Sequence, residues 1–156
     1  MERISFSKFP KGIADQMMSA EAYLKKTTLD VKLLELMRLR VSQINGCPYC
    51  VDMHYKLLKH AGETDLRISL LPAWKESGYF TEEECNVLEF AENLTRMYNS
   101  EVSEALYTRL KKHFSEDEIA DLTYAVSQQN TWNRIVRTFH FEAGHFRVPQ
   151  EAESMV

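Results

Sequence analysis

The stretch "ELMRLRVSQINGCPYCVDMHYKLLKHAG", from Glu35 to Gly62, combines a helical apolar pattern with a pair of cysteines. Cys47 and Cys50 are three positions apart, and His54 follows Cys50 by four. On a helix, residues four apart share a face, so His54 can accept the Cys50 proton directly or through a water. The pair is compatible with a metal clip, a structural disulfide or a redox site.

Helical periodicity is expected on both sides of the cysteines. Asp30 can cap a helix that runs to about Ile44. Gly46 favours a stop there, and Pro48 suits the first turn of a further helix that ends before Gly62. The apolar face of the first helix consists of Leu34, Met37, Val41 and Ile44.

The rest of the chain also has helical spacing. A helix is expected over 13–26, with Ile13, Met17, Ala20 and Leu24 on one face, and a short piece over 64–71. Two later helices begin with capping-box spacing, at Thr81/Glu84 and Ser115/Glu118. Residues 115–143 contain no Gly or Pro, and we expect two helices there, broken near "SQQNTW" at 127–132. The sequence therefore predicts an all-α domain of seven or eight helices, residues 1–156, with a flexible tail from about 147.

Composition limits the classes of function. The 156 residues are 44% hydrophobic and 27% charged, with a net charge of -4 and only 5 Gly and 4 Pro. This charge provides no basic face for nucleic acid. No apolar run is long enough to span a membrane, and the N-terminus lacks the apolar block of a signal peptide. We therefore expect a cytoplasmic protein that binds neither nucleic acid nor membrane.

A redox role is the favoured interpretation of the cysteine pair. A zinc site takes four ligands, whereas the cysteine pair and His54 provide only three. Cys85 has no partner at the spacing of a second ligand pair. A permanent disulfide is disfavoured in the cytoplasm and by the odd count of 3 cysteines. Placement at a helix start stabilises a thiolate, and Tyr49 adds a hydroxyl that can donate or relay a proton. No metal or cofactor is expected.

The motif E-x11-C-P-Y-C-x3-H, formed by Glu35, Cys47, Cys50 and His54, resembles the core of the AhpD-like alkylhydroperoxidases of the carboxymuconolactone decarboxylase superfamily. Its flanking residues through Ala61-Gly62 are also similar, and "NTWNRIVRTF" at 130–139 resembles a later helix of that family. The resemblance spans residues 10–145. It implies an all-α fold that assembles into homo-oligomers (a dimer, trimer or hexamer).

The resemblance further implies a dithiol peroxidase. Cys50 would be peroxidatic and attack a hydroperoxide, Cys47 would resolve the sulfenic acid to a disulfide, and a dithiol or lipoyl-type partner would reduce it. Glu35 and His54 would form the proton relay. By pattern alone Glu35 is a solvated helix residue; if it is buried near the cysteines, we expect a raised pKa and a role as base.

One residue departs from the family pattern. Characterised members can have histidine between the cysteines, where this chain has Tyr49, a poorer base at neutral pH. Two alternatives therefore stay open. One is a disulfide oxidoreductase or redox sensor with little peroxidase activity, and the other is a non-enzymatic zinc-clipped or structural helical module.

Overall fold

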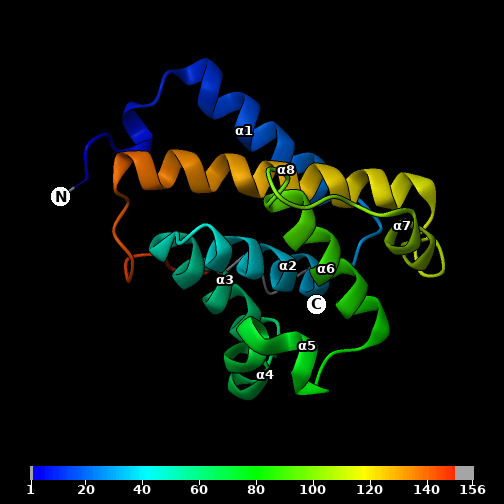
Figure 1. Ribbon diagram of the computed structural model, residues 1–156. Coiled ribbons are helices and arrows are strands. Elements are labelled where there is room, and N and C mark those ends of the chain that lie inside the picture. The colour runs from blue at the N-terminus through cyan, green and yellow to red at the C-terminus, as the bar shows by residue number, and fades with distance from the viewer. Residues whose placement is uncertain (1, 150–156) are drawn as a thin grey trace.

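Residues 2–149 are described by a computed structural model, and they fold into helices with no strand among them (Figure 1). The expected all-α class and helix number are confirmed for these residues. Of the predicted tail, residues 150–156 lie outside the described part. The α-helices are α1 (Lys11–Leu24), α2 (Val31–Ile44), α3 (Pro48–His60), α4 (Asp65–Leu70), α5 (Trp74–Ser77), α6 (Glu82–Thr95), α7 (Glu104–Leu110) and α8 (Glu116–Phe139), with 3-10 turns η1 (Phe6–Lys8) and η2 (Leu71–Ala73).

Helix α2 lies at the centre of the fold and contacts α3, α6 and α8. Its predicted apolar face packs into one buried cluster with α6, α7 and α8, through Leu34, Met37 and Val41. A second face, which the predicted stripe did not include, packs into a separate cluster with α3, α4, η2 and α6 through Leu36 and Leu39. A helix that is apolar on more than one side is a buried helix. Helix α2, which leads into the turn with the cysteines, is therefore buried on more than one side.

The predicted break near residues 127–132 is wrong, because α8 is continuous from Glu116 to Phe139. The polar residues of this segment do not compete with the helix backbone. Gln129 and Asn130 form hydrogen bonds with side chains of α2 and of the turn that follows it, and the hydroxyls of Ser127 and Thr131 donate to carbonyls four residues earlier. Figure 1 shows α8 as one long helix beside α1 and α2.

Helix starts follow their predicted capping residues. The Asp30 side chain accepts from the Leu33 N–H, and the capping boxes of Thr81 and Ser115 are both complete. Helix α1 buries Met17, Ala20 and Leu24 as expected, but Ile13 is exposed because it lies in the first turn, beyond the core. None of the helices described in residues 2–149 is long and apolar enough to cross a membrane.

The turn between α2 and α3 sets the position of the first cysteine. Gly46 has φ +60, a left-handed conformation that strains other residues. Its N–H donates to the Gln43 carbonyl and the Cys47 N–H donates to the Ser42 carbonyl at 3.0 Å, which is the Schellman pattern. Cys47 therefore leaves α2 in a fixed direction and immediately begins α3.

Candidate active site

The two cysteines of the motif form a disulfide at the start of α3. Their Cα atoms are 5.4 Å apart, within the range that a disulfide requires. Cys47 is the N-cap residue of α3, and its Sγ accepts from the Cys50 N–H at 3.4 Å, while Pro48 occupies the first turn. Unpaired N–H groups and the positive end of the helix dipole meet at this sulfur pair, and both favour a thiolate there once the disulfide is reduced.

Aromatic side chains cover the disulfide. Cys47 is 0% and Cys50 1% exposed, and with Val136 they form a small buried cluster. Tyr49, Trp132 and Phe141 pack against that cluster. The amino-terminal segment adds further rings, since Phe6 lies 6.0 Å from Trp132 and Phe9 6.1 Å from Phe141, measured between ring centroids. A reactant can therefore touch the sulfurs only after part of this cover moves.

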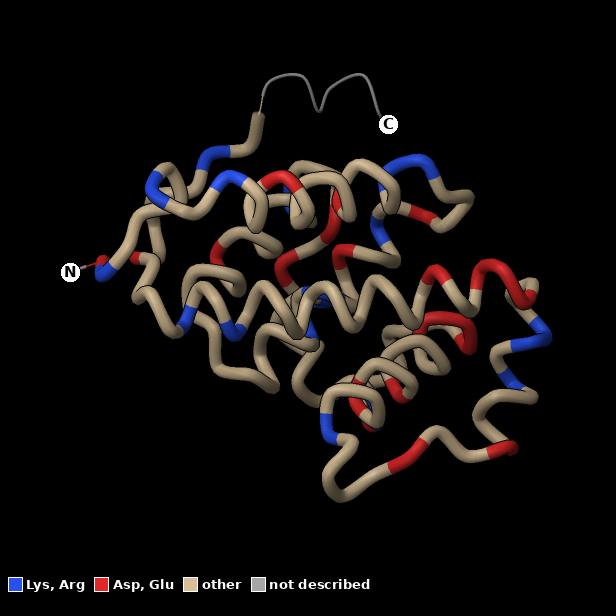
Figure 2. Tube along the Cα trace, turned by 90° about the horizontal axis from the view of Figure 1, so that it is seen from above, with Lys and Arg blue, Asp and Glu red and all other residues tan. Residues whose placement is uncertain are grey.

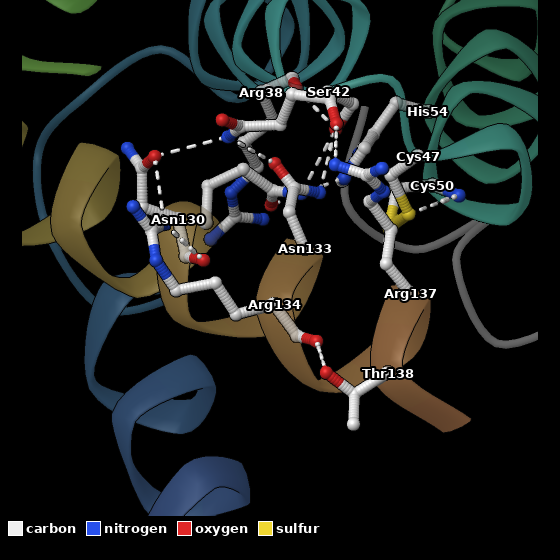
Figure 3. Close-up of a disulfide and its surroundings, with 12 residues drawn as sticks. Arg38, Ser42, Cys47, Cys50, His54, Asn130, Asn133, Arg134, Arg137 and Thr138 are labelled. Carbon is white, nitrogen blue, oxygen red and sulfur yellow. Dashed lines mark hydrogen bonds between the residues drawn. A yellow bond between two sulfur atoms is a disulfide. The ribbon is translucent and has the colours of Figure 1, made fainter. Parts of the chain in front are cut away.

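His54 lies one helical turn beyond Cys50 and is buried, with 1% of its surface exposed. Its Nδ1 is 2.6 Å from Oε2 of Glu35, which reaches it from α2. Glu35 is also buried, so the charge of its carboxylate is compensated by neighbouring groups rather than by water. The structure thus brings Cys47, Cys50 and His54 together (Figure 3). Glu35 contacts His54 from the preceding helix, as the motif predicted, and one tight turn joins the two helices.

The expected raised pKa of Glu35 is wrong. Burial alone raises this pKa, but the charge and hydrogen bonds of His54 and then of Arg38 outweigh it and lower the pKa to about 2. The Arg38 Nη1 atom donates to Glu35 Oε1 at 2.9 Å. Glu35 is therefore ionised at neutral pH. In this state its carboxylate can accept a hydrogen bond from the His54 ring and balance a positive charge on it.

Arg38 extends the charged network to α1. Its Nη2 donates to Oε2 of Glu21 at 2.9 Å, and the other oxygen of Glu21 accepts from Trp132 Nε1 at 2.7 Å. Glu21 thereby links the buried ion pair to one of the aromatic rings that cover the disulfide. No buried charge in this network is left unpaired, because each charged group faces one of opposite sign.

Gln129 of α8 contacts the other side of His54. Its Oε1 lies 3.1 Å from His54 Nε2, and its Nε2 donates to the Ser42 hydroxyl at 3.0 Å. The Ser42 hydroxyl donates its only proton to the Arg38 carbonyl at 2.8 Å and also accepts from Asn133 Nδ2 at 3.2 Å. Because Ser42 has no further proton to give, the Gln129 nitrogen must face Ser42 and its oxygen must face His54.

This orientation gives the His54 ring a hydrogen-bond acceptor on each side. Glu35 is an ionised acceptor on one side, and the Gln129 oxygen is an acceptor on the other. Both contacts are hydrogen bonds only when both ring nitrogens carry a proton. The network therefore stabilises the ring once it has accepted a second proton, because Glu35 then balances the charge of the imidazolium.

Tyr49 lies in the aromatic cover and not in the charged network. Its ring packs edge-on against Phe141 at 5.6 Å between centroids, and it is only partly buried. Burial, then the carboxylates of Asp52 and Glu2, raise the pKa of its hydroxyl. The phenol is thus neutral near pH 7 and is a proton donor rather than a base.

Arg38, Ser42 and Gln129 belong to the network around His54, although the sequence pattern did not identify them. The available signal was the run of uncharged polar residues in 127–133, which we interpreted as a helix break. Such a run inside a helix needs buried partners, and α2 supplies them. Within residues 2–149, no group of three or more His, Cys, Asp or Glu side chains is placed to hold a metal ion.

Similarity to known proteins shows the family to which this chain belongs. Residues 12–93, which include both cysteines, Glu35 and His54, match the carboxymuconolactone decarboxylase family. YdfG, an uncharacterized protein of Bacillus subtilis, is 38% identical over 135 residues, which cover 86% of this chain and 91% of YdfG. The chain belongs to the carboxymuconolactone decarboxylase family.

Solved structures of similar proteins agree with this membership. The fold of this chain matches that of ATU0492 of Agrobacterium tumefaciens, with a TM-score of 0.88 and 33% identity. The match covers 94% of this chain and 100% of ATU0492. ATU0492 is a protein of unknown function for which a role as the antioxidant defence protein AhpD was suggested. The debrominase Bmp8, with a TM-score of 0.76 and 13% identity over 86% of this chain and 73% of its own, shares the fold alone.

Proposed function

We propose that this family member is a dithiol peroxidase of the AhpD type. The observation that carries the proposal is the buried Cys47–Cys50 pair with His54 one turn away, where Glu35 is poised to stabilise a positive charge on the ring. A cysteine becomes a strong nucleophile when a neighbouring base takes its proton and the thiolate is stabilised. The helix start and His54 supply these two conditions at Cys50.

The first chemical step uses Cys50 and His54. His54 takes the thiol proton, and the Cys50 thiolate attacks the distal oxygen of a hydroperoxide, which breaks the O–O bond and forms a sulfenic acid. The leaving alkoxide receives the proton held on the ring and departs as an alcohol. Glu35 stabilises the imidazolium between these two transfers, and Gln129 orients the ring from the other side.

The second step closes the disulfide. The Cys47 thiol first loses its proton. Its thiolate then bonds to the sulfur of the Cys50 sulfenic acid and displaces hydroxide, which takes up the proton and leaves as water. A dithiol or lipoyl-type reductant then returns two electrons and two protons. The sum is one hydroperoxide and one external dithiol converted to an alcohol, water and an external disulfide.

The test follows both the mass of the protein and the fate of the peroxide. One equivalent of an alkyl hydroperoxide should lower the intact mass of the reduced protein by two hydrogens, and dithiothreitol should restore it. Cys50→Ser should abolish peroxide consumption, whereas Cys85→Ser, which changes the free cysteine, should keep it. Full activity in Cys50→Ser would refute the proposal.

A disulfide oxidoreductase is the second candidate, and Tyr49 favours it. The neutral phenol adds no second base next to the thiols. A disulfide acceptor releases a thiolate, which needs a proton donor less than the alkoxide that a peroxide releases. The initial rates of the reduced protein with an alkyl hydroperoxide and with oxidised lipoamide separate the two. A lipoamide rate more than about tenfold above the peroxide rate would favour the oxidoreductase.

We also propose that the protein works as a homo-oligomer in the cytoplasm. The resemblance to AhpD-like enzymes supports the assembly, and the exposed aromatic and aliphatic side chains of α1, Ile13, Met18 and Tyr23, offer apolar surface for it. Light scattering coupled to gel filtration tests this proposal, with a monomer mass as the outcome against it.

A further inference from the structure

A polar hollow lies beside the disulfide on the surface of α8. Its volume is about 430 Å³, and it is lined by Asn45, Asn133, Arg134, Arg137 and Thr138. No carboxylate lines it, although acidic residues outnumber basic ones in the chain, 23 to 19. Figure 3 shows three α8 residues that are not part of the network around His54, namely Arg134, Arg137 and Thr138, on the stretch of helix that runs past the cysteines.

The two arginines of the hollow are held in place but not neutralised. Arg134 Nη1 donates to the Asn130 carbonyl at 2.8 Å, and Arg137 Nη1 donates to the Asn45 carbonyl at 2.7 Å. Within residues 2–149, neither forms an ion pair with a carboxylate. Each guanidinium therefore has N–H groups left to donate, and a guanidinium fork matches the oxygens of a carboxylate or phosphate.

A third arginine adds to the positive charge here. Arg3, from the amino-terminal segment, donates through Nη1 to the carbonyl of Thr138 at 3.1 Å. Figure 2 shows the contrast along α8, whose first turns carry Asp and Glu while its last turns carry Arg. The basic end is the one that passes the disulfide, so a negatively charged group is attracted to the site and not to the opposite end of the helix.

Three contacts connect the hollow to the reacting atoms. Arg137 holds the carbonyl of Asn45, two residues before Cys47. Its neighbour Val136 packs directly on the disulfide. Asn133 donates to Ser42, whose carbonyl accepts the Cys47 N–H. A ligand held in the hollow is thus attached to the same turn that positions Cys47.

We infer that this hollow binds the carboxylate or phosphate group of a small molecule that reacts at the dithiol. The link to the dithiol rests on the proposed function, whereas the binding of the oxyanion does not. The arginines and amides hold the charged end of the molecule, and its reactive end extends toward the aromatic cover. The site would therefore favour a hydroperoxide or a thiol that carries an acidic group over its neutral analogue.

The binding is tested without any enzymatic activity. Inorganic phosphate and propanoate are titrated separately into the oxidised protein, and the arginine Nε–Hε signals are followed by NMR at low salt. Saturable shifts are expected for Arg134 and Arg137. Arg134→Gln and Arg137→Gln should each weaken the binding about tenfold, whereas Lys112→Gln, which removes the same charge from an exposed site in the turn after α7, should not. Absence of saturable shifts, or equal weakening in all three variants, would overturn the site.

Two matched pairs of reactants then identify which molecule carries the acidic group. One pair is a fatty-acid hydroperoxide and its methyl ester, and the other is dihydrolipoate and dihydrolipoamide. For the true ligand, the ratio of kcat/KM for the acid to that for its neutral analogue should fall about tenfold in Arg134→Gln and stay constant in Lys112→Gln. If phosphate and propanoate bind but neither ratio changes, the hollow has no role at the dithiol and that part of the inference is wrong.

Discussion

Two buried glutamates in this fold both have cationic partners, but only one of them contacts a histidine. Glu35 on α2 and Glu92 on α6 are both 6% exposed, and each pairs with an arginine. In both carboxyls burial raises the pKa, but the partners lower it by more, so the net pKa is below the ordinary value. Besides Arg40, Glu92 contacts Trp74 Nε1–H, Lys75 and Arg96, whereas the partner of Glu35 besides Arg38 is His54.

This difference shows what separates a structural ion pair from a candidate catalytic one. A buried carboxylate with a lowered pKa is found at both places and does not identify a function by itself. What identifies the candidate site is a histidine, the side chain best suited to moving protons, next to a group that can react. His54 meets this condition beside Cys50, and nothing around Glu92 does.

Replacing each glutamate should separate the two roles most clearly. Glu35→Gln keeps the shape but removes the charge that stabilises the imidazolium, and kcat/KM for an alkyl hydroperoxide should fall about 100-fold. Glu92→Gln should reduce it by less than about threefold while lowering the free energy of unfolding by about 3 kcal/mol, because it breaks a buried ion pair. Peroxide consumption with dithiothreitol as reductant and urea unfolding measure the two effects. Equal losses of activity would show that the comparison fails.

Acid should remove the stability that Glu35 contributes. Its pKa is about 2 in the folded protein against an ordinary 4.5, so the ionised form stabilises the fold above pH 4.5 and this contribution is lost as the pH falls toward 2. The shift corresponds to about 3 kcal/mol. Urea unfolding at pH 5, 4 and 3 should show a steeper loss in the wild type than in Glu35→Gln. Parallel curves would mean that Glu35 is not charged in the folded state.

Neighbouring glutamines of α8 provide a matched pair with a smaller effect. Gln129→Met removes the acceptor for His54 Nε2 and should lower kcat/KM about tenfold and move its pH profile, because the doubly protonated ring loses a hydrogen bond. Gln128 is also buried, but its Nε2 has no hydrogen-bond partner among the described residues, so Gln128→Met should change neither rate nor profile. The pH dependence of peroxide consumption decides between a specific effect and a general loss of packing.

The smallest effect is expected from the cap of the helix that carries Glu92. Thr81→Ala removes the acceptor for the Glu84 N–H and should cost about 1 kcal/mol of unfolding free energy. The rate with hydroperoxide should not change, since α6 contributes no residue to the dithiol. A proportional loss of activity would indicate that the two regions are coupled more closely than their contacts suggest.

The sequence predicted local features well and paired polar side chains poorly. The caps at Asp30, Thr81 and Ser115 and the stop at Gly46 depend on residues within a few positions of each other, and all four are present. The contacts of Gln129 join residues 75 and 87 positions apart, and no local pattern specifies them. The direction of the Glu35 pKa shift was wrong because it depends first on His54, 19 positions away, and then on Arg38, which is only three positions away but was not recognised as a partner.

The sulfur that closes the disulfide also caps α3, since Cys47 Sγ accepts the Cys50 N–H. A thiolate accepts a hydrogen bond more strongly than a disulfide sulfur does. Reduction therefore tightens the first turn of α3, and oxidation loosens it. The rate at which the Cys50 amide proton exchanges with solvent becomes a measure of redox state, so the backbone itself carries a signal of whether the protein has met an oxidant.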